Sequence, residues 1–233
     1  IKSNADGEIT VGSATKVTVT TTSLNTTANV TMAGQTANVT ANLFISGANS
    51  IISSANEVWV GGEGAILYYN EKKNFWKTLD QGRGISGGIV WDMCISDRHL
   101  WTATSRGINR IDLATHSINP IGIEEYFRDT QVYSIKNIND QIWIGSRKGL
   151  FIYSQDDPKL INALDLQKKD ELINNFYNFT SIHENDDLVY VAGDMGVARF
   201  NTTQNEWELI SPSVVYGAET VYSMTVNDKF LFL

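Results

Sequence analysis

The stretch "QIWIGSRKGLFIYS", from Gln141 to Ser154, is the part of the chain that decides its fold class. An apolar run centred on Trp143 leads into Gly-Ser-Arg-Lys-Gly, and a second apolar run follows and ends near Tyr153. Two short apolar runs joined by a glycine-containing turn predict a β-hairpin. A hairpin that recurs at a fixed interval would be one unit of a repeat array, so the spacing of similar stretches determines how the whole chain is interpreted.

The hairpin recurs along the chain with a nearly constant period. Its central aromatic residues are spaced by 42, 42 and 47 positions, at Trp59, Trp101, Trp143 and Tyr190. A glycine follows each aromatic residue by five or six positions: Gly64, Gly107, Gly149 and Gly196. A second apolar motif has the same period, with spacings of 42, 47 and 42, and begins at Val90, Val132, Phe179 and Val221. A polar turn separates this motif from the next aromatic, at residues 97–98, 139–140, 186–187 and 227–228.

Each unit therefore contains four short strands, the last of them weak, as in "KLINAL" and "EWELI". Four antiparallel strands with a period in the low forties indicate one blade of a β-propeller. We expect an all-β chain with four blades that start near Ala48, Ile89, Gln131 and Asn178. A partial fifth blade would start at Thr220, and we expect the chain to be a fragment of a larger propeller.

The stretch "VYSIKNINDQIWIGSRKGLFIYS" resembles the propeller repeats of two-component-regulator sensor proteins. Their pattern is V-x-S-I, a polar turn, and then L-W-I-G-T-x-x-G-L-x-x-[YF]. The resemblance covers about residues 47–233, although the W-I-G glycine of the pattern is missing two positions after Trp101 and Tyr190 replaces a tryptophan. It implies propeller architecture and, as one possible role, ligand sensing outside the cytoplasm.

Residues 1–46 differ from the repeats, because they are rich in Thr, Ala, Asn and Val. Alternation of Val with Thr or Asn predicts a Thr-rich β stalk, and a plain Thr-rich linker is the alternative. The stretch "AGQTANVTANL" resembles the late strands of Ig-like surface modules. N-x-[ST] sequons predict glycosylation at five asparagines. Asn25, Asn29 and Asn38 lie in this segment, and Asn178 and Asn201 lie in the repeats.

Composition argues against several classes of function. The net charge of −8 disfavours nucleic-acid binding on electrostatic grounds, since like charges repel. No apolar run in the sequence approaches the roughly 18 residues of a membrane span. Cys94, the single cysteine, stands in an apolar run and is expected to be a small buried residue.

Ligands of propellers usually bind among the loops at one mouth of the central channel. Here these are the between-blade loops and the turns between the second and third strands of each blade. Guanidinium groups and exposed aromatic rings suit carboxylates, sugars and peptides. The predicted ligand-binding residues are Arg83, Arg106, Tyr126, Arg128, Arg147, Lys148, Tyr177, Asp194 and Tyr216.

We expect no catalytic activity, no cofactor and no metal site, because no nucleophile elbow, phosphate loop or paired-cysteine motif is present. The favoured interpretation is an extracellular or cell-surface propeller that binds a glycan, peptide or protein partner. The first alternative is a periplasmic or extracellular sensory domain of a two-component receptor. A second is a structural subunit of a surface filament or layer, which would self-assemble through the N-terminal β segment.

Overall fold

The computed structural model describes residues 2–3, 9–10, 47–54, 56–165, 176–212, 220–227 and 231–232. The chain divides into two units, Ile1–Leu43 and Phe44–Leu233. In the first unit, β1 (Lys2–Ser3) pairs antiparallel with β2 (Ile9–Thr10). Residues 11–46 of the predicted stalk, with the sequons at Asn25, Asn29 and Asn38, fall outside the described residues, so the stalk and its glycosylation stay predictions.

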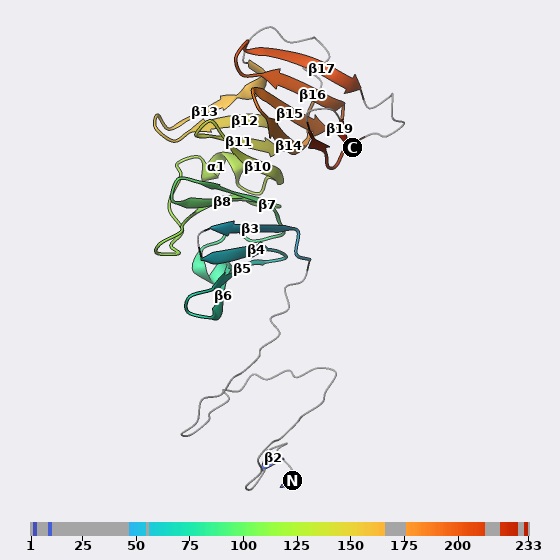
Figure 1. Cartoon of the computed structure of the whole chain (residues 1–233). Coiled ribbons are helices and arrows are strands. Elements are labelled where there is room, and N and C mark those ends of the chain that lie inside the picture. The colour runs from blue at the N-terminus through green and yellow to red at the C-terminus, as the bar shows by residue number, and fades with distance from the viewer. Residues whose placement is uncertain are drawn as a thin grey trace. The chain divides into compact units, whose positions relative to one another are not determined.

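The second unit is a series of antiparallel sheets in which each strand pairs with the next in sequence (Figure 1). The first sheet contains β3 (Ser50–Ser54), β4 (Glu57–Gly61), β5 (Ala65–Asn70) and β6 (Phe75–Asp80). The second contains β7 (Val90–Ser96), β8 (His99–Thr104) and β9 (Gly107–Asp112). The third contains β10 (Val132–Ile138), β11 (Gln141–Ser146), β12 (Gly149–Ser154) and β13 (Lys159–Asn162). The fourth contains β14 (Phe179–Asn185), β15 (Leu188–Gly193), β16 (Gly196–Asn201) and β17 (Glu206–Pro212).

The remaining elements are short. A pair of strands, β18 (Thr225–Val226) and β19 (Leu231–Phe232), belongs to the partial fifth blade. The 3-10 helix η1 (Gln81–Arg83) and the helix α1 (Glu124–Phe127) lie between blades, and the 3-10 helix η2 (Ala163–Asp165) follows the third sheet. Among the described residues, no helix is long and apolar enough to cross a membrane.

The sheets stack against one another as propeller blades do. Successive first strands are in contact, β3 with β7, β7 with β10, β10 with β14, and β14 with β18. Figure 1 shows the four sheets one above another, from β3–β6 to β14–β17. A separate hydrophobic cluster fills each space between neighbouring sheets. The predicted all-β propeller of four blades and a partial fifth is therefore confirmed.

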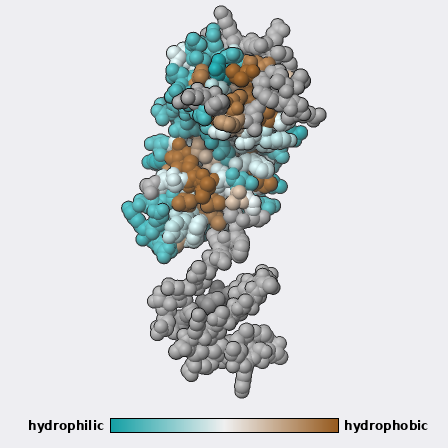
Figure 2. Space-filling view, turned by 45° about the vertical axis from the view of Figure 1, so that its right-hand side comes forward, coloured by the Kyte–Doolittle hydropathy of each residue, from teal (hydrophilic) through white to brown (hydrophobic). Residues whose placement is uncertain are grey.

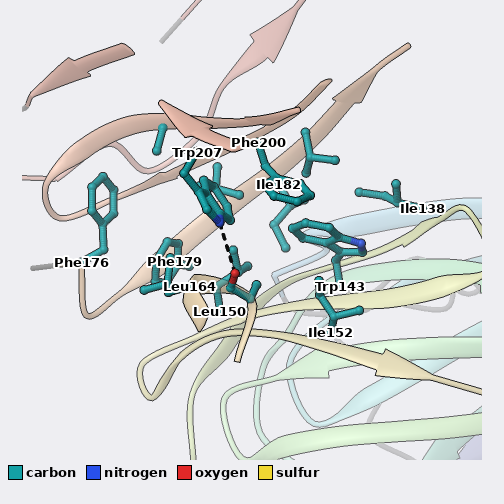
Figure 3. Close-up of a cluster of buried hydrophobic side chains, with 14 residues drawn as sticks. Ile138, Trp143, Leu150, Ile152, Leu164, Phe176, Phe179, Ile182, Phe200 and Trp207 are labelled. Carbon is teal, nitrogen blue, oxygen red and sulfur yellow. Dashed lines mark hydrogen bonds between the residues drawn. The ribbon is translucent and has the colours of Figure 1, made fainter. Parts of the chain in front are cut away.

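The central tryptophans occupy the spaces between blades, as the repeat predicts. Trp59, Trp101 and Trp143 are all buried, whereas Tyr190 is only partly buried. At the interface of the third and fourth blades, Trp143 packs with Phe200, whose ring centroid lies 5.8 Å away (Figure 3). The indole Nε1 of Trp207 donates a hydrogen bond of 3.2 Å to the carbonyl oxygen of Ala163. The third and fourth blades are thus held together by aromatic packing across their interface.

The turn residues also behave as predicted. Asp97, Asn139 and Asp186 have φ angles of 53°, 50° and 52°, which Asn and Asp tolerate better than most residues. Gly107 and Gly149 have φ angles of 131° and 130°, which a side chain would resist. These turns set the register of the hairpins and therefore which side chains reach the loop face.

The second blade departs from the predicted four strands. Its sheet has three strands, and the fourth is reduced to an isolated bridge between Ile111 and Ile118. The Asp112 carboxylate accepts hydrogen bonds from the backbone N–H groups of Ala114 and Thr115, which tightens the turn after β9. Pro120 then lacks the N–H that a longer ladder would need. The fourth strand expected in the second blade is therefore too short to form.

Candidate functional site

The turns between the second and third strands of blades two and three have the same local structure. In the second blade, the buried Thr104 hydroxyl donates to the Gly107 carbonyl at 3.0 Å and accepts from the Arg106 N–H at 3.1 Å. In the third, Ser146 makes the corresponding bonds with Gly149 at 2.9 Å and Lys148 at 3.2 Å. A buried hydroxyl therefore fixes each turn and holds its cationic side chain at the loop face.

The loop between these two blades completes the site. At the start of its helix α1, the Glu124 carboxylate accepts hydrogen bonds from the N–H groups of Ile121 and Gly122, which precede the helix. Burial acts to raise the pKa of Glu124, but these backbone hydrogen bonds and the nearby Arg110 outweigh it and lower that pKa. Glu124 therefore stays ionised as a structural anion at the helix start.

Tyr126 of this loop lies beside Lys148 of the third-blade turn. The Lys148 Nζ is 4.9 Å from the centroid of the Tyr126 ring, and it also donates to the Tyr126 carbonyl. The backbone N–H of Arg147 donates to the Gln131 carbonyl at 2.9 Å. These contacts tie the turn of the third blade to the loop that precedes it.

The turns of the second and third blades and the loop between these blades surround a cavity of about 510 Å³, here called the basic pocket. Its lining residues are Ser105, Arg106, Asp129, Thr130, Gln131, Arg147 and Lys148. Arg106, Arg147 and Lys148 are exposed, so their charges face solvent. Asp129 is the one carboxylate in this lining. Three cations beside one anion leave a net positive pocket on a chain whose net charge is −8. Hydroxyl and amide groups add further hydrogen-bonding capacity.

A second cavity, of about 380 Å³, adjoins the basic pocket and shares Arg106 and Asp129 with it. Arg128 and Arg110 also line it. The guanidinium of Arg110 lies 5.7 Å from the Trp101 ring centroid, and its Nε is buried without a hydrogen-bond partner. Arg128 forms an ion pair with Glu125, so its charge is partly compensated. The carboxylates of Glu124 and Asp129 also line this cavity, so its three guanidinium groups are largely compensated.

The structure brings together five of the nine predicted ligand-binding residues: Arg106, Tyr126, Arg128, Arg147 and Lys148. Arg83 lies in η1, next to Gly84, which lines the second cavity. Tyr216 is outside the described residues.

Tyr177 and Asp194 lie at the corresponding loop of the fourth blade. The Asp194 carboxylate accepts hydrogen bonds from the Tyr177 N–H and from the Asn178 Nδ2, both at 3.2 Å. The geometry gives Asp194 a positioning role, because it ties the between-blade loop to its turn.

Sequence reasoning missed Ser105, Asp129, Thr130 and Gln131 as pocket residues. The repeat did hold a signal for one of them, since Ser105 occupies the position in the second blade that Arg147 has in the third, 42 residues later. The others lie on the between-blade loop, whose path depends on how α1 packs. Phe127 of α1 is fully buried among residues of both blades, so a tertiary contact sets that path.

A third cavity, of about 710 Å³, lies along the first strands of the blades and includes Trp91, Tyr133, Thr180 and Tyr222 in its lining. Trp91, Tyr133 and Thr180 each sit at a register shift of the first strand. A bulge re-aims the side chain at the extra residue, which explains why equivalent positions converge here. The neighbouring Asp92 accepts from the Ser134 hydroxyl at 2.9 Å and the Ile135 N–H at 3.0 Å, so it joins two blades.

The two predicted sequons in described residues have partners in the fold. The Asn178 side-chain nitrogen donates to Asp194, and Asn178 also lines the third cavity. The Asn201 Oδ1 accepts from the backbone N–H groups of Thr203 and Gln204, at a turn. Their glycosylation stays a prediction.

Comparison with known proteins gives the fold a context. No protein-family model matches the chain. A protein of Formosa agariphila named histidine kinase P4 is 24% identical over 75% of this chain, and the match covers 17% of that protein. The chain therefore spans about a sixth of that relative's length.

Solved structures with the same fold include extracellular domains of two sensor systems of B. thetaiotaomicron. The BT4673 domain matches with a TM-score of 0.62 and 14% identity over 81% of this chain and 26% of that one. The extracellular domain of the putative hybrid two-component system BT3049 matches with a TM-score of 0.59 and 15% identity over the same shares of the two chains. PorZ, a surface component of the type-IX secretion system of Porphyromonas gingivalis, matches with a TM-score of 0.56 and 13% identity, over 82% of this chain and 26% of PorZ.

Proposed function

We propose that these blades form part of an extracytoplasmic ligand-sensing domain of a two-component receptor. The likeness to sensor extracellular domains and to a histidine kinase favours this role over a surface module with no signalling output. The role is binding, and the chemistry of signalling would belong to another part of the receptor. Its place would be the periplasm or the cell exterior, where the ligand is met.

The basic pocket is the proposed ligand site, and one observation carries this assignment. Arg106, Arg147 and Lys148 come from turns of two blades and line the same cavity, together with Thr130 and Gln131. Guanidinium groups bind carboxylates with two parallel hydrogen bonds, and the hydroxyl and amide groups suit polar substituents. The Tyr126 ring beside Lys148 offers an aromatic surface at the rim. The ligand is therefore an acidic molecule with carboxylate groups.

Isothermal titration calorimetry tests the site. The probes are a short oligogalacturonate and a short oligoglutamate, which share carboxylates but differ in backbone, with a neutral oligosaccharide as reference. The test variant replaces Arg106, Arg147 and Lys148 with alanine. A matched control replaces Lys72, Lys73 and Lys77, which are three exposed cations of the first blade.

We expect an acidic probe to bind, and the test variant to lose at least about tenfold in affinity, since a hydrogen bond to a charged group contributes about 1.5–3 kcal/mol. The control variant should bind like the unmodified chain. Equal losses in both variants would mean that only net charge matters, and binding of neither acidic probe would remove the assignment. The probe that binds more tightly distinguishes a glycan from a peptide.

A further inference from the structure

The second blade leaves part of its last strand without a neighbour. The sheet of this blade ends at β9, because its fourth strand does not form. On the outer side of β9, the Arg110 carbonyl accepts a hydrogen bond from the Asn119 N–H at 2.8 Å. The Asp112 N–H donates to the Ser117 carbonyl on the same side, at 2.9 Å. Alternate residues of an antiparallel strand direct their backbone groups to the same side, so the N–H and C=O of Ile108 also point outward.

Within the described ranges, nothing pairs with Ile108 on that outer side. There, β9 pairs with β8 along its whole length, and its other pairing is the isolated bridge between Ile111 and Ile118. No backbone hydrogen bond from a turn or loop of the described residues reaches Ile108. The outer side of residues 107–110 is here called the open edge.

The other blades fill the equivalent place. In the fourth blade, β17 continues to the repeat glycine, with Pro212 opposite Gly196. In the first blade, β6 continues until Asp80 lies opposite Ala65, the residue after the repeat glycine. In the third blade, β13 ends earlier, and η2 lies against β12. The open edge is therefore a feature of the second blade that the other three blades do not share.

The second cavity, of about 380 Å³, lies along the open edge. Residues 107–110 line it, and its other wall includes Asn119, Pro120 and Ile121. Its volume falls within the range of ligand pockets, about 300–1,000 Å³. The surface of the unit mixes hydrophilic and hydrophobic patches, shown in teal and brown in Figure 2, so apolar area alone does not mark a ligand site. Unpaired backbone groups beside a cavity are a more specific sign, because a buried N–H or C=O needs a hydrogen-bond partner.

The second cavity and the basic pocket meet at Arg106 but differ in charge. Arg106 and Asp129 line both of them. In the second cavity the guanidinium groups are accompanied by Glu124 and Asp129, whereas the basic pocket carries three cations and one anion. Within the described part of the chain, Arg106, Arg147 and Lys148 form no ion pair. A ligand that fits both cavities is therefore neutral along the open edge and anionic at the end that enters the basic pocket.

The direction of the missing strand determines which end of a peptide would enter the basic pocket. Neighbouring strands of these blades are antiparallel, so a strand added to β9 runs against it. In the fourth blade the carboxyl end of β17, at Pro212, lies opposite the repeat glycine Gly196. In the second blade the repeat glycine is Gly107, and Arg106 stands directly before it. The carboxyl end of an added strand therefore arrives at Arg106 and the basic pocket.

We propose that the ligand of the basic pocket is the C-terminal end of an extended peptide, which binds as the fourth strand of the second blade. This inference rests on the proposed ligand role of the basic pocket and deepens it by naming a peptide as the ligand. The last residue of the peptide lies opposite Gly107, and its carboxylate binds the three cations of the basic pocket. The penultimate residue lies opposite Ile108, as Ser211 lies opposite Val197, and exchanges both backbone hydrogen bonds with it. Addition of a strand to an exposed sheet edge is a recurring mode of peptide recognition.

The open edge favours a peptide over an acidic glycan. Ile108 offers an N–H donor and a C=O acceptor side by side, and a peptide backbone presents the complementary pair at every second residue. A uronic acid chain has carboxylates for the basic pocket but no backbone amides for the open edge.

Isothermal titration calorimetry with four tetrapeptides tests the proposal on the 233-residue chain. The parent probe is N-acetylated Thr-Val-Thr-Val with a free carboxylate, whose residues favour strands and carry no side-chain charge. The second probe replaces the carboxylate with an amide. The third is N-methylated at its penultimate residue, which removes the donor to the Ile108 carbonyl. The fourth is N-methylated at its last residue, whose N–H points away from the open edge, and is the matched control.

We expect the parent probe to bind, and the amide to bind at least about tenfold more weakly, because hydrogen bonds to charged groups are lost. Methylation of the penultimate residue should weaken binding about fivefold or more, and methylation of the last residue should leave it unchanged. In the variant that replaces Arg106, Arg147 and Lys148 with alanine, the preference for the free carboxylate over the amide should disappear.

Amide hydrogen exchange measured by NMR locates the bound peptide. The Ile108 N–H should exchange rapidly in the free chain, and its exchange should slow at least about tenfold when the parent probe saturates the site. The Asn109 N–H is directed at β8, so it is the internal reference and should exchange slowly in both states.

Four outcomes would overturn the inference. The free acid and the amide could bind equally, or methylation of the penultimate residue could have no effect. The Ile108 N–H could be protected in the free chain, which would mean that this chain, or a second copy if protection rises with concentration, covers the open edge. Binding of oligogalacturonate at the basic pocket without binding of any peptide would remove the inference but leave the proposed function, whereas failure of every acidic probe would remove both.

Discussion

Two tryptophans at equivalent positions offer a direct comparison of a covered and an uncovered blade face. Trp207 and Trp76 occupy the same register position of the fourth strand in the fourth and first blades, and are 5% and 47% exposed. Replacing each with alanine in the 233-residue chain removes the same atoms. The difference in unfolding free energy between the two variants therefore measures how much the covering blade stabilises a tryptophan at this position.

The magnitude follows from burial. An aromatic side chain buries up to about 200 Å², so at about 25 cal/mol per Å² the loss is about 5 kcal/mol for Trp207 and about half that for Trp76. Trp207→Ala also loses the hydrogen bond to the Ala163 carbonyl, a further loss of about 1 kcal/mol. Trp207→Ala should thus destabilise the chain by about 3.5 kcal/mol more than Trp76→Ala.

Urea unfolding followed by far-ultraviolet circular dichroism measures both variants against the unmodified chain. The midpoint should fall much further for Trp207→Ala than for Trp76→Ala. The midpoint of Trp207→Phe should lie between those of Trp207→Ala and Trp76→Ala, because phenylalanine keeps an aromatic ring but lacks the indole donor. Equal midpoints for the two alanine variants would refute the reasoning, since the blade interface would then contribute nothing at this position.

Three further predictions concern the blade interfaces and the turn after β9. Gly145→Ala should destabilise the chain by about 1–3 kcal/mol in urea unfolding, because the new Cβ would lie 2.8 Å from the Phe179 carbonyl oxygen of the next blade. Gly82→Ala, near only the flexible Asp80 carboxylate, is its control, and equal effects would contradict the close approach. Burial, with Asp92 adding to it, raises the pKa of the Cys94 thiol to about 12, so iodoacetamide at pH 8.5 should label Cys94 only after unfolding, as read by mass spectrometry. Labelling of the folded chain at the rate of free cysteine would overturn this expectation. Hydrogen bonds from Thr115 and the nearby Arg98 lower the pKa of Asp112, so its stabilisation is present above the unfolded pKa and is lost as pH falls through the lower folded pKa. Asp112→Ala should therefore lower the urea midpoint at pH 7. The difference in midpoint from the unmodified chain should shrink as the pH falls below the ordinary Asp pKa of 3.8, whereas a difference that does not change with pH would contradict the cause.

The blade architecture could be predicted from the sequence because it is local. Trp143 and Gly149 lie six positions apart in one hairpin, and the turn angles at Asn139 and Gly149 depend on residues adjacent in sequence. The same period identified the buried tryptophans of three blades. The missing fourth strand of the second blade was overlooked, since it depends on how the Asp112 carboxylate tightens the turn before Pro120.

The candidate site could be predicted only in outline. Arg106 and Lys148 were recognisable because both stand just before the repeat glycine in turns of known direction. The participation of Thr130 and Gln131 could not be predicted, because it depends on Phe127 packing between two blades. Trp76 and Trp207 each stand 17 positions after the central aromatic residue of their blade, so the repeat already marked them as equivalent, and only their different burial required the structure.

Peptide mapping of the native protein by mass spectrometry tests the central claim most directly. The account predicts one polypeptide that contains these blades, a membrane-spanning segment and a histidine kinase domain. A native polypeptide that contains the blades but has no kinase domain would contradict the sensor role and would restore the surface-binding module as the better interpretation.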